Sequence, residues 1–140
     1  MITCTRRIQF CAGHRVYQHE SKCRNMHGHN YVALFKATCP CLDEIGRVID
    51  FSVLKEKIGG WIECYWDHGF IYFVDDEEVR HALEMVKGQK VYITTFNPTA
   101  ENMADYLLRV ICPEVLRETN VTVTKVVIWE TENCFAEAVL

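Results

Sequence analysis

The 140-residue sequence lacks the features that mark membrane, exported or nucleic-acid-binding proteins. No stretch approaches the roughly 20 consecutive apolar residues of a membrane-spanning helix, and the N-terminus has no apolar segment typical of signal peptides. No long run of Lys or Arg occurs, and the formal net charge is -4. We therefore expect a cytoplasmic protein with no nucleic-acid or membrane partner, acting on a small molecule.

Proline and glycine are scarce, with 3 and 7 residues, and no linker, low-complexity segment or internal repeat interrupts the chain. Hydrophobic residues make up 49% of the sequence, which is enough for the core of one domain of this length. The 8 cysteines are expected to remain thiols, because reducing buffers keep cytoplasmic cysteines unpaired. We predict one domain that spans residues 1–140.

Apolar periodicity predicts four strands. Residues 4–12 and 30–38 alternate between two faces, as half-buried strands do. Residues 121–129 are rich in β-branched side chains, and residues 135–139 can return as a last strand after a turn.

Two main helices are expected between these strand pairs. The first starts at Asp50, and Gly59-Gly60 is its weak point. The second covers 97–111, with Asn97 as its cap, and is expected to end at Pro113. A short surface helix is expected at 79–86. The order β-β-α-α-β-β predicts an α+β fold, with an antiparallel four-stranded sheet and the two helices on one face, whose open edges favour an oligomer.

Three histidines at the ends of the first two strands are the strongest chemical signal. His27 and His29 lie two apart and therefore share one strand face, and His14 leaves the neighbouring strand. Three imidazoles with an open fourth position suit catalytic zinc, although imidazole also binds copper, iron and nickel. A His-x-His pair taken alone can also be two ordinary polar residues.

Cys23 stands four residues before His27, in a polar segment between Lys22 and Arg24. Two neighbouring cations favour a thiolate, which can close a four-ligand structural site or act beside the metal as a base or nucleophile. Cys39-Pro40-Cys41 has a spacing found in metal sites, but no second pair completes it, so we assign it a packing or loop role.

Two acidic positions are further candidates. In Asp67-His68 the carboxylate can fix the imidazole tautomer for general acid or base catalysis, although surface loops often contain such pairs. Glu130 ends a predicted strand, where its carboxylate can accept two hydrogen bonds from an amino-heterocycle or can simply be a solvated strand end.

Taken together, these residues resemble the 6-pyruvoyl-tetrahydropterin synthase superfamily over nearly the whole chain. The short spacing between Cys23 and the His-Gly-His block resembles its 6-carboxy-tetrahydropterin synthase branch. The matching segments, in the family's order, are Phe10-Cys11-Ala12-Gly13-His14, Cys23 with His27-Gly28-His29-Asn30-Tyr31, Gly46-Arg47-Val48-Ile49-Asp50-Phe51, Asp67-His68, Asn97-Pro98-Thr99-Ala100-Glu101-Asn102 and Trp129-Glu130-Thr131.

The resemblance implies a tunnelling fold, in which trimers close their sheets into a barrel and two trimers stack into a hexamer with active sites at subunit junctions. It also implies a role for each matching residue. His14, His27 and His29 would bind zinc, Cys23 would abstract a proton, Asp67 and His68 would relay protons, Glu130 would anchor the pterin, and Thr99, Glu101 and Thr131 would be lesser pocket residues. Lys22, Arg24 and Arg15 flank this site and are candidate triphosphate contacts.

By analogy, the substrate is 7,8-dihydroneopterin triphosphate, and the products are 6-carboxy-5,6,7,8-tetrahydropterin, acetaldehyde and triphosphate, on the queuosine pathway. Two alternatives stay open: 6-pyruvoyl-tetrahydropterin synthesis or a related side-chain lyase, and a non-catalytic zinc module with Cys23 as fourth ligand. The sequence departs from the family pattern at Cys11, at Gly13 and in Phe70-Ile71-Tyr72-Phe73.

Overall fold

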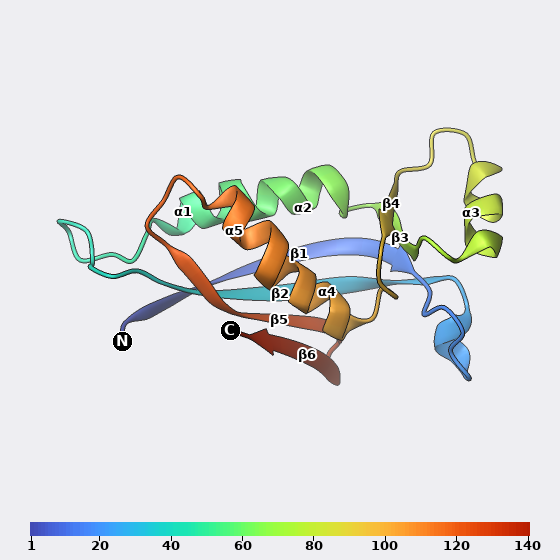
Figure 1. Cartoon of the computed structure of the whole chain (residues 1–140), viewed down its shortest axis with the longest axis horizontal. Helices are drawn as coiled ribbons and strands as arrows, with labels where there is room; N and C mark the ends of the chain where they lie inside the picture. Colours follow the sequence, from blue (N-terminus) through green and yellow to red (C-terminus); the bar gives the residue numbers. More distant parts are fainter.

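The computed structural model describes residues 1–140 and is built around a six-stranded sheet in the order β4-β3-β1-β2-β5-β6 (Figure 1). The pairs β1·β2, β2·β5 and β5·β6 are antiparallel, whereas β3 is parallel to both β1 and β4. The predicted α+β fold is confirmed. The strands are β1 Thr3–His14, β2 His27–Thr38, β3 Gly69–Phe73, β4 Val91–Thr94, β5 Thr122–Thr131 and β6 Cys134–Val139.

The sheet differs from the prediction in having two more strands and in being mixed rather than antiparallel. β3 and β4 are short, with 5 and 4 residues, and three of the five β3 residues are buried. A short parallel strand buried on both sides does not alternate between apolar and polar residues, so periodicity does not reveal it. β2 also begins three residues earlier than expected, which places His27 and His29 inside the strand.

The first helical segment runs without a break through α1 Phe51–Leu54, the π-helical turn η2 Lys55–Gly59 and α2 Gly60–Tyr65. Asp50 caps it as predicted, accepting a hydrogen bond from the Ser52 backbone N–H at 2.8 Å. The two glycines at 59 and 60 do not interrupt it, because the wider π turn continues directly into α2.

The second helical segment consists of α4 Ala100–Tyr106, the π-helical turn η3 Leu107–Ile111 and α5 Cys112–Val115. Two predictions about its ends are wrong. Thr99, not Asn97, is the N-cap, since its hydroxyl accepts from the Asn102 N–H at 3.2 Å. Pro113 does not end the helix but lies in the first turn of α5, where its missing N–H removes no required hydrogen bond.

A third helix, α3 Glu77–Glu84, starts two residues before the predicted one and is capped by the buried Asp76. It connects β3 to β4 at one end of the molecule, on the side where the short 3-10 turn η1 Lys22–Arg24 also lies (Figure 1). None of the helices combines the length and apolar character needed to cross a membrane.

The two long helical segments cover one face of the sheet (Figure 1). Strand alternation turns Phe10 and Ala12 of β1, and Tyr31, Ala33 and Phe35 of β2, toward these helices, and all five are buried. The helices contribute the other half of the core. Its largest fully buried helical side chains are Leu54, Ile58, Ile62, Met103, Leu107, Leu108 and Ile111.

Candidate metal centre

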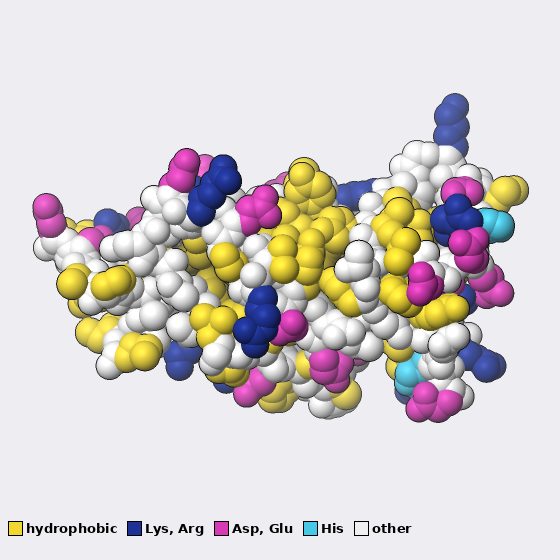
Figure 2. Space-filling model, in the orientation of Figure 1, with side chains coloured by type: hydrophobic (Ala, Val, Ile, Leu, Met, Phe, Trp, Pro, Cys, Tyr) yellow, Lys and Arg dark blue, Asp and Glu magenta, His cyan; other side chains and the backbone are white.

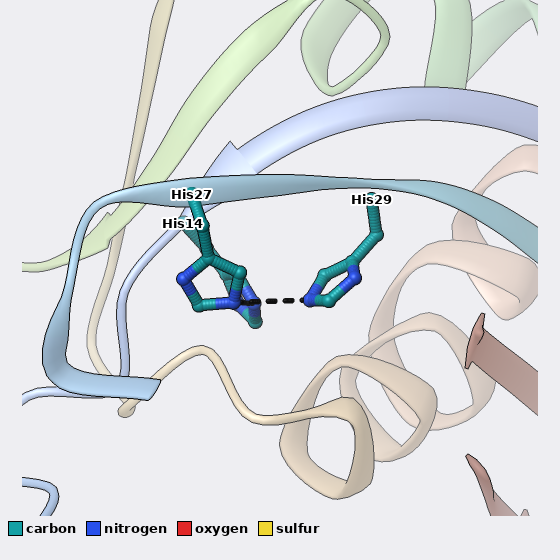
Figure 3. Close-up of side chains that lie close together, drawn as sticks. All are labelled: His14, His27 and His29. Carbon is teal, nitrogen blue, oxygen red and sulfur yellow. Dashed lines mark hydrogen bonds between the residues drawn. The ribbon is translucent and has the colours of Figure 1, made fainter. Parts of the chain in front are cut away.

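Three histidines converge at the end of the β1–β2 pair (Figure 3). His14 lies directly across from His27 in the antiparallel register, and His29 lies across from Ala12, so all three rings share the buried face. The Nε2 atom of His27 is 3.1 Å from Nε2 of His14 and 3.1 Å from Nε2 of His29. Their possible ligand atoms all lie within 4.8 Å of one another, and the Cys23 thiol is not among them.

The hydrogen bonds of two rings determine where their protons are. His14 Nδ1 is 2.7 Å from the Pro98 carbonyl oxygen, and His27 Nδ1 is 2.6 Å from the Asn25 carbonyl oxygen. A carbonyl only accepts, so both Nδ1 atoms carry a proton, and in the neutral imidazole each Nε2 atom then presents a lone pair.

Two lone pairs that face each other at 3.1 Å cannot bond to one another, but both can bind one cation. Tetrahedral zinc with bonds of about 2.0–2.1 Å places its ligand nitrogens about 3.3 Å apart. The histidines therefore fit such a metal, and their Nδ1 bonds to carbonyls are the support that metal-binding histidines ordinarily have.

Burial favours the neutral form of two of these imidazoles, His14 and His29. It lowers the pKa of His14 to about 4; the Pro98 hydrogen bond opposes this shift, and repulsion from His27 and His29 adds to it. Burial, followed by repulsion from His27, also lowers the pKa of His29. The neutral imidazole is the form that binds metals, so the site is prepared for a cation at neutral pH.

Glu130 faces the cluster from β5, next to a register shift between Trp129 and Thr131. One carboxylate oxygen lies 3.9 Å from His14 Nε2, and the other lies 3.9 Å from His29 Nε2. Burial, followed by repulsion from Glu101, raises the pKa of Glu130. A half-buried carboxylate without a close donor in its own chain is suited to a ligand that brings N–H groups.

A hollow of about 270 Å³ meets the histidine cluster at Glu130. Several predicted residues border it: Cys23, Thr99, Glu101 and Glu130. His19 and Cys134 border it too, although no local sequence pattern marks them. Thr131 borders a different hollow, which it shares with His29 and Glu130 but which is otherwise lined from the opposite sheet face by Gln9, Val32 and Leu34. The Thr131 hydroxyl accepts from the Asn133 N–H at 3.2 Å.

Asp67 and His68 do not join this group within one chain. Asp67 accepts hydrogen bonds from the Cys11 N–H at 2.9 Å and from His68 Nδ1 at 2.8 Å. His68 borders a hollow with Cys11 and Asn30, whose side chains alternate to the sheet face opposite the three histidines. The His68 side chain is 78% exposed.

The three cations proposed as triphosphate contacts differ in their surroundings. Lys22 and Arg24 are exposed on η1 beside Cys23. Arg15, by contrast, donates from Nε and Nη2 to Asp76 at 2.6 Å each and from Nη1 to Glu78 at 2.9 Å. With its donors directed at two carboxylates, Arg15 holds the start of α3, and we do not retain it as a phosphate contact.

Gly13 and Phe70, two positions that depart from the family pattern, lie in contact with each other. A Cβ at Gly13 would lie 2.6 Å from Cδ2 of Phe70, so the larger residue in β3 needs the absence of a side chain in β1.

The chain is similar to known proteins over nearly its whole length. The model of the family "6-pyruvoyl tetrahydropterin synthase" matches residues 3–139. A protein of Rickettsia typhi named 6-carboxy-5,6,7,8-tetrahydropterin synthase is 43% identical, covering 98% of this chain and 99% of the relative. A relative of the same name from Aquifex aeolicus is 33% identical, covering 93% of each chain.

Solved structures show the same fold. An uncharacterized protein of Wolinella succinogenes superposes with a TM-score of 0.83 at 24% identity, covering 99% of this chain and 97% of that one. The 6-pyruvoyl tetrahydropterin synthase of Caenorhabditis elegans superposes with a TM-score of 0.65 at 25% identity, covering 99% and 95%.

Proposed function

This chain belongs to the 6-pyruvoyl tetrahydropterin synthase family of lyase-type enzymes, and from that premise we propose that it is a zinc-dependent 6-carboxy-5,6,7,8-tetrahydropterin synthase. In the proposed reaction, 7,8-dihydroneopterin triphosphate and water give 6-carboxy-5,6,7,8-tetrahydropterin, acetaldehyde and triphosphate, in the cytoplasm and on the queuosine pathway. The names of the Rickettsia and Aquifex relatives support this branch. The short spacing between Cys23 and His27 supports it as well.

The observation that carries the proposal is the convergence of the Nε2 atoms of His14, His27 and His29, at least two of them with lone pairs directed inward. These three residues would hold the metal. Zinc bound there would polarise the side-chain oxygens of the substrate and make the neighbouring C–H more acidic.

Cys23 is the proposed base of this site. Its thiol borders the same hollow as Glu130 and Glu101 but does not belong to the histidine cluster, so it remains free to act on the substrate. In the thiolate form, the Cys23 sulfur would remove a proton from the substrate side chain. This arrangement favours a catalytic role over a closed four-ligand structural site.

Glu130 would orient the pterin. Its carboxylate can accept two parallel hydrogen bonds from the amino group and the ring N–H of a pterin, which would offset the burial that raises its pKa. Thr99 and Glu101 line the same hollow and would contribute lesser contacts. Thr131 borders the hollow lined mainly from the opposite sheet face and would contribute from there.

Because His68 borders a hollow on the opposite sheet face and is held by Asp67, we propose that this pair serves the site of a neighbouring subunit. His68, oriented by Asp67, would return protons as the substrate side chain is cleaved. A second subunit would also use the free edges of the sheet, which are β6 on one side and, on the other, β4 and residues 3–10 of β1.

We propose a hexamer built from two trimers whose sheets close into barrels. Phe135 and Val139 on β6, and Val91 and Ile93 on β4, are exposed apolar side chains on edge strands that such assembly would cover. Apolar side chains also gather in the middle and toward the α3 end of the face shown in Figure 2.

Acetaldehyde release tests this function. The zinc-loaded protein is mixed with 7,8-dihydroneopterin triphosphate, and acetaldehyde is detected through NADH oxidation by alcohol dehydrogenase. His29→Ala, which removes one proposed ligand, is expected to lose both zinc and acetaldehyde formation. A zinc-loaded wild-type protein that consumes the substrate without forming acetaldehyde would contradict the proposed reaction.

A further inference from the structure

Asn97 makes bonds that no role assigned so far explains. Its side chain pairs with the backbone of Tyr17, 80 residues earlier in the chain: Oδ1 accepts from the Tyr17 N–H at 2.8 Å, and Nδ2 donates to the Tyr17 carbonyl at 2.9 Å. Because the backbone N–H only donates and the carbonyl only accepts, this pair fixes the orientation of the amide.

These bonds complete a closed circuit of covalent and hydrogen bonds that includes His14, one of the proposed metal ligands. From His14 the chain runs three residues to Tyr17, crosses through the amide pair to Asn97, and continues by one peptide bond to Pro98. The Pro98 carbonyl then accepts from His14 Nδ1 at 2.7 Å and completes the circuit. Pro98 and His14 are both buried, so no solvent molecule is available to replace that carbonyl.

The backbone of Asn97 is held as well. Its carbonyl accepts from the Asn102 side-chain Nδ2 at 2.9 Å and from the Thr99 N–H at 2.8 Å. Asn102 also donates its own N–H to the Thr99 hydroxyl, so the first turn of α4 fixes the segment that presents Pro98.

We infer that Asn97 is a positioning residue of the metal site, which acts through Pro98 to hold His14 in the Nδ1–H tautomer with its Nε2 lone pair toward the metal. The inference rests on the metal part of the proposed function. Without the amide pair, the Pro98 carbonyl is no longer tied to the segment that carries His14. The His14 imidazole then loses its fixed tautomer and orientation. Loss of such support typically weakens metal binding by about 10- to 100-fold.

The test compares zinc affinity, measured by competition with a chromophoric chelator, in the full-length wild type and in Asn97→Asp. The substitution keeps the acceptor for the Tyr17 N–H. It replaces the amide donor with a carboxylate oxygen, which cannot donate to the Tyr17 carbonyl and repels it. We expect zinc affinity to fall by about 10- to 100-fold. In NMR spectra of the metal-free protein, the slowly exchanging His14 Nδ1 proton is expected to disappear in the variant.

Two controls separate positioning from general damage. Asn120→Asp makes the same chemical change in an exposed loop, and Val126→Ala destabilises the core away from the site; both are expected to keep wild-type zinc affinity. If Asn97→Asp fails to fold, Asn97→Ala, which removes both side-chain bonds to Tyr17 and adds no charge, decides the question, with weaker zinc binding expected.

The outcomes are distinct. A wild-type protein that binds no zinc at the three histidines would refute the proposed function itself. A wild-type protein that binds zinc, together with a folded Asn97→Asp variant that binds it within twofold and keeps the His14 Nδ1 proton, would overturn only the inference about Asn97. If Asn97→Asp is unfolded, unchanged zinc affinity in Asn97→Ala would overturn that inference equally.

Discussion

Removal of the Arg15 guanidinium is expected to cost more stability than any surface ion pair in this protein. Asp76 is 1% exposed and loses two charge-assisted bonds of 2.6 Å in Arg15→Met, keeping only the Val79 N–H at 3.2 Å. Breaking a buried pair by removing one partner costs about 3–5 kcal/mol. Because the Arg15 side chain is 17% exposed, we expect the lower end, about 3 kcal/mol.

A double-mutant cycle isolates this pair. Asp76→Asn keeps the shape and the helix cap and removes the buried charge, so it is expected to cost about 1–2 kcal/mol, and the double variant Arg15→Met/Asp76→Asn little more. Glu78→Gln, at an exposed partner, is expected to change stability by less than about 1 kcal/mol. Urea unfolding at pH 7 and one fixed subunit concentration measures all four.

The reasoning would be refuted if the free energy of unfolding of Arg15→Met lay within about 1 kcal/mol of the wild-type value. If that variant instead showed unchanged stability and a raised KM for the triphosphate substrate, Arg15 would be a phosphate contact after all, as the sequence first indicated.

Three further predictions concern single positions. Gly13→Ala brings a Cβ to 2.6 Å from Phe70 and is expected to cost about 1–3 kcal/mol; Gly13→Ala/Phe70→Leu is expected to recover most of it in thermal melts. Burial opposes ionisation of Asp67, but hydrogen bonds from a backbone N–H and the adjacent imidazole outweigh it and lower the folded pKa. Its stabilisation is therefore present above the unfolded pKa of about 4 and lost as pH falls through the folded value, so the melting-temperature advantage over Asp67→Asn is expected to shrink below pH 4. Thr99→Ala is expected to lose about 1 kcal/mol in urea unfolding and Thr99→Ser almost none, because only the serine keeps the capping oxygen.

The antiparallel part of the fold was predictable because each strand is long and buries one face. β1 and β2 alternate over 12 residues each, so period and extent are visible in the sequence. β3 and β4 gave no such signal, because Phe70-Ile71-Tyr72-Phe73 is a continuous apolar run whose parallel pairing depends on distant residues. The helix end expected at Pro113 was wrong because the preceding π turn lets a proline start a new turn.

The convergence of the three histidines was predictable because strand geometry converts a spacing of two into a shared face, as for His27 and His29. The bonds that support them were not, because the pairing of Asn97 with Tyr17 spans 80 residues and leaves no local pattern. Arg15 illustrates the same limit: its position beside His14 suggested a phosphate contact, but Asp76, 61 residues later, takes up its charge.

Identification of the pterin product by mass spectrometry tests the central claim most directly. Zinc-loaded wild type and Cys23→Ala are incubated with 7,8-dihydroneopterin triphosphate, after equal zinc content has been established for both. The account predicts 6-carboxy-5,6,7,8-tetrahydropterin from the wild type and none from the variant. A 6-pyruvoyl product, or full activity in Cys23→Ala, would contradict it.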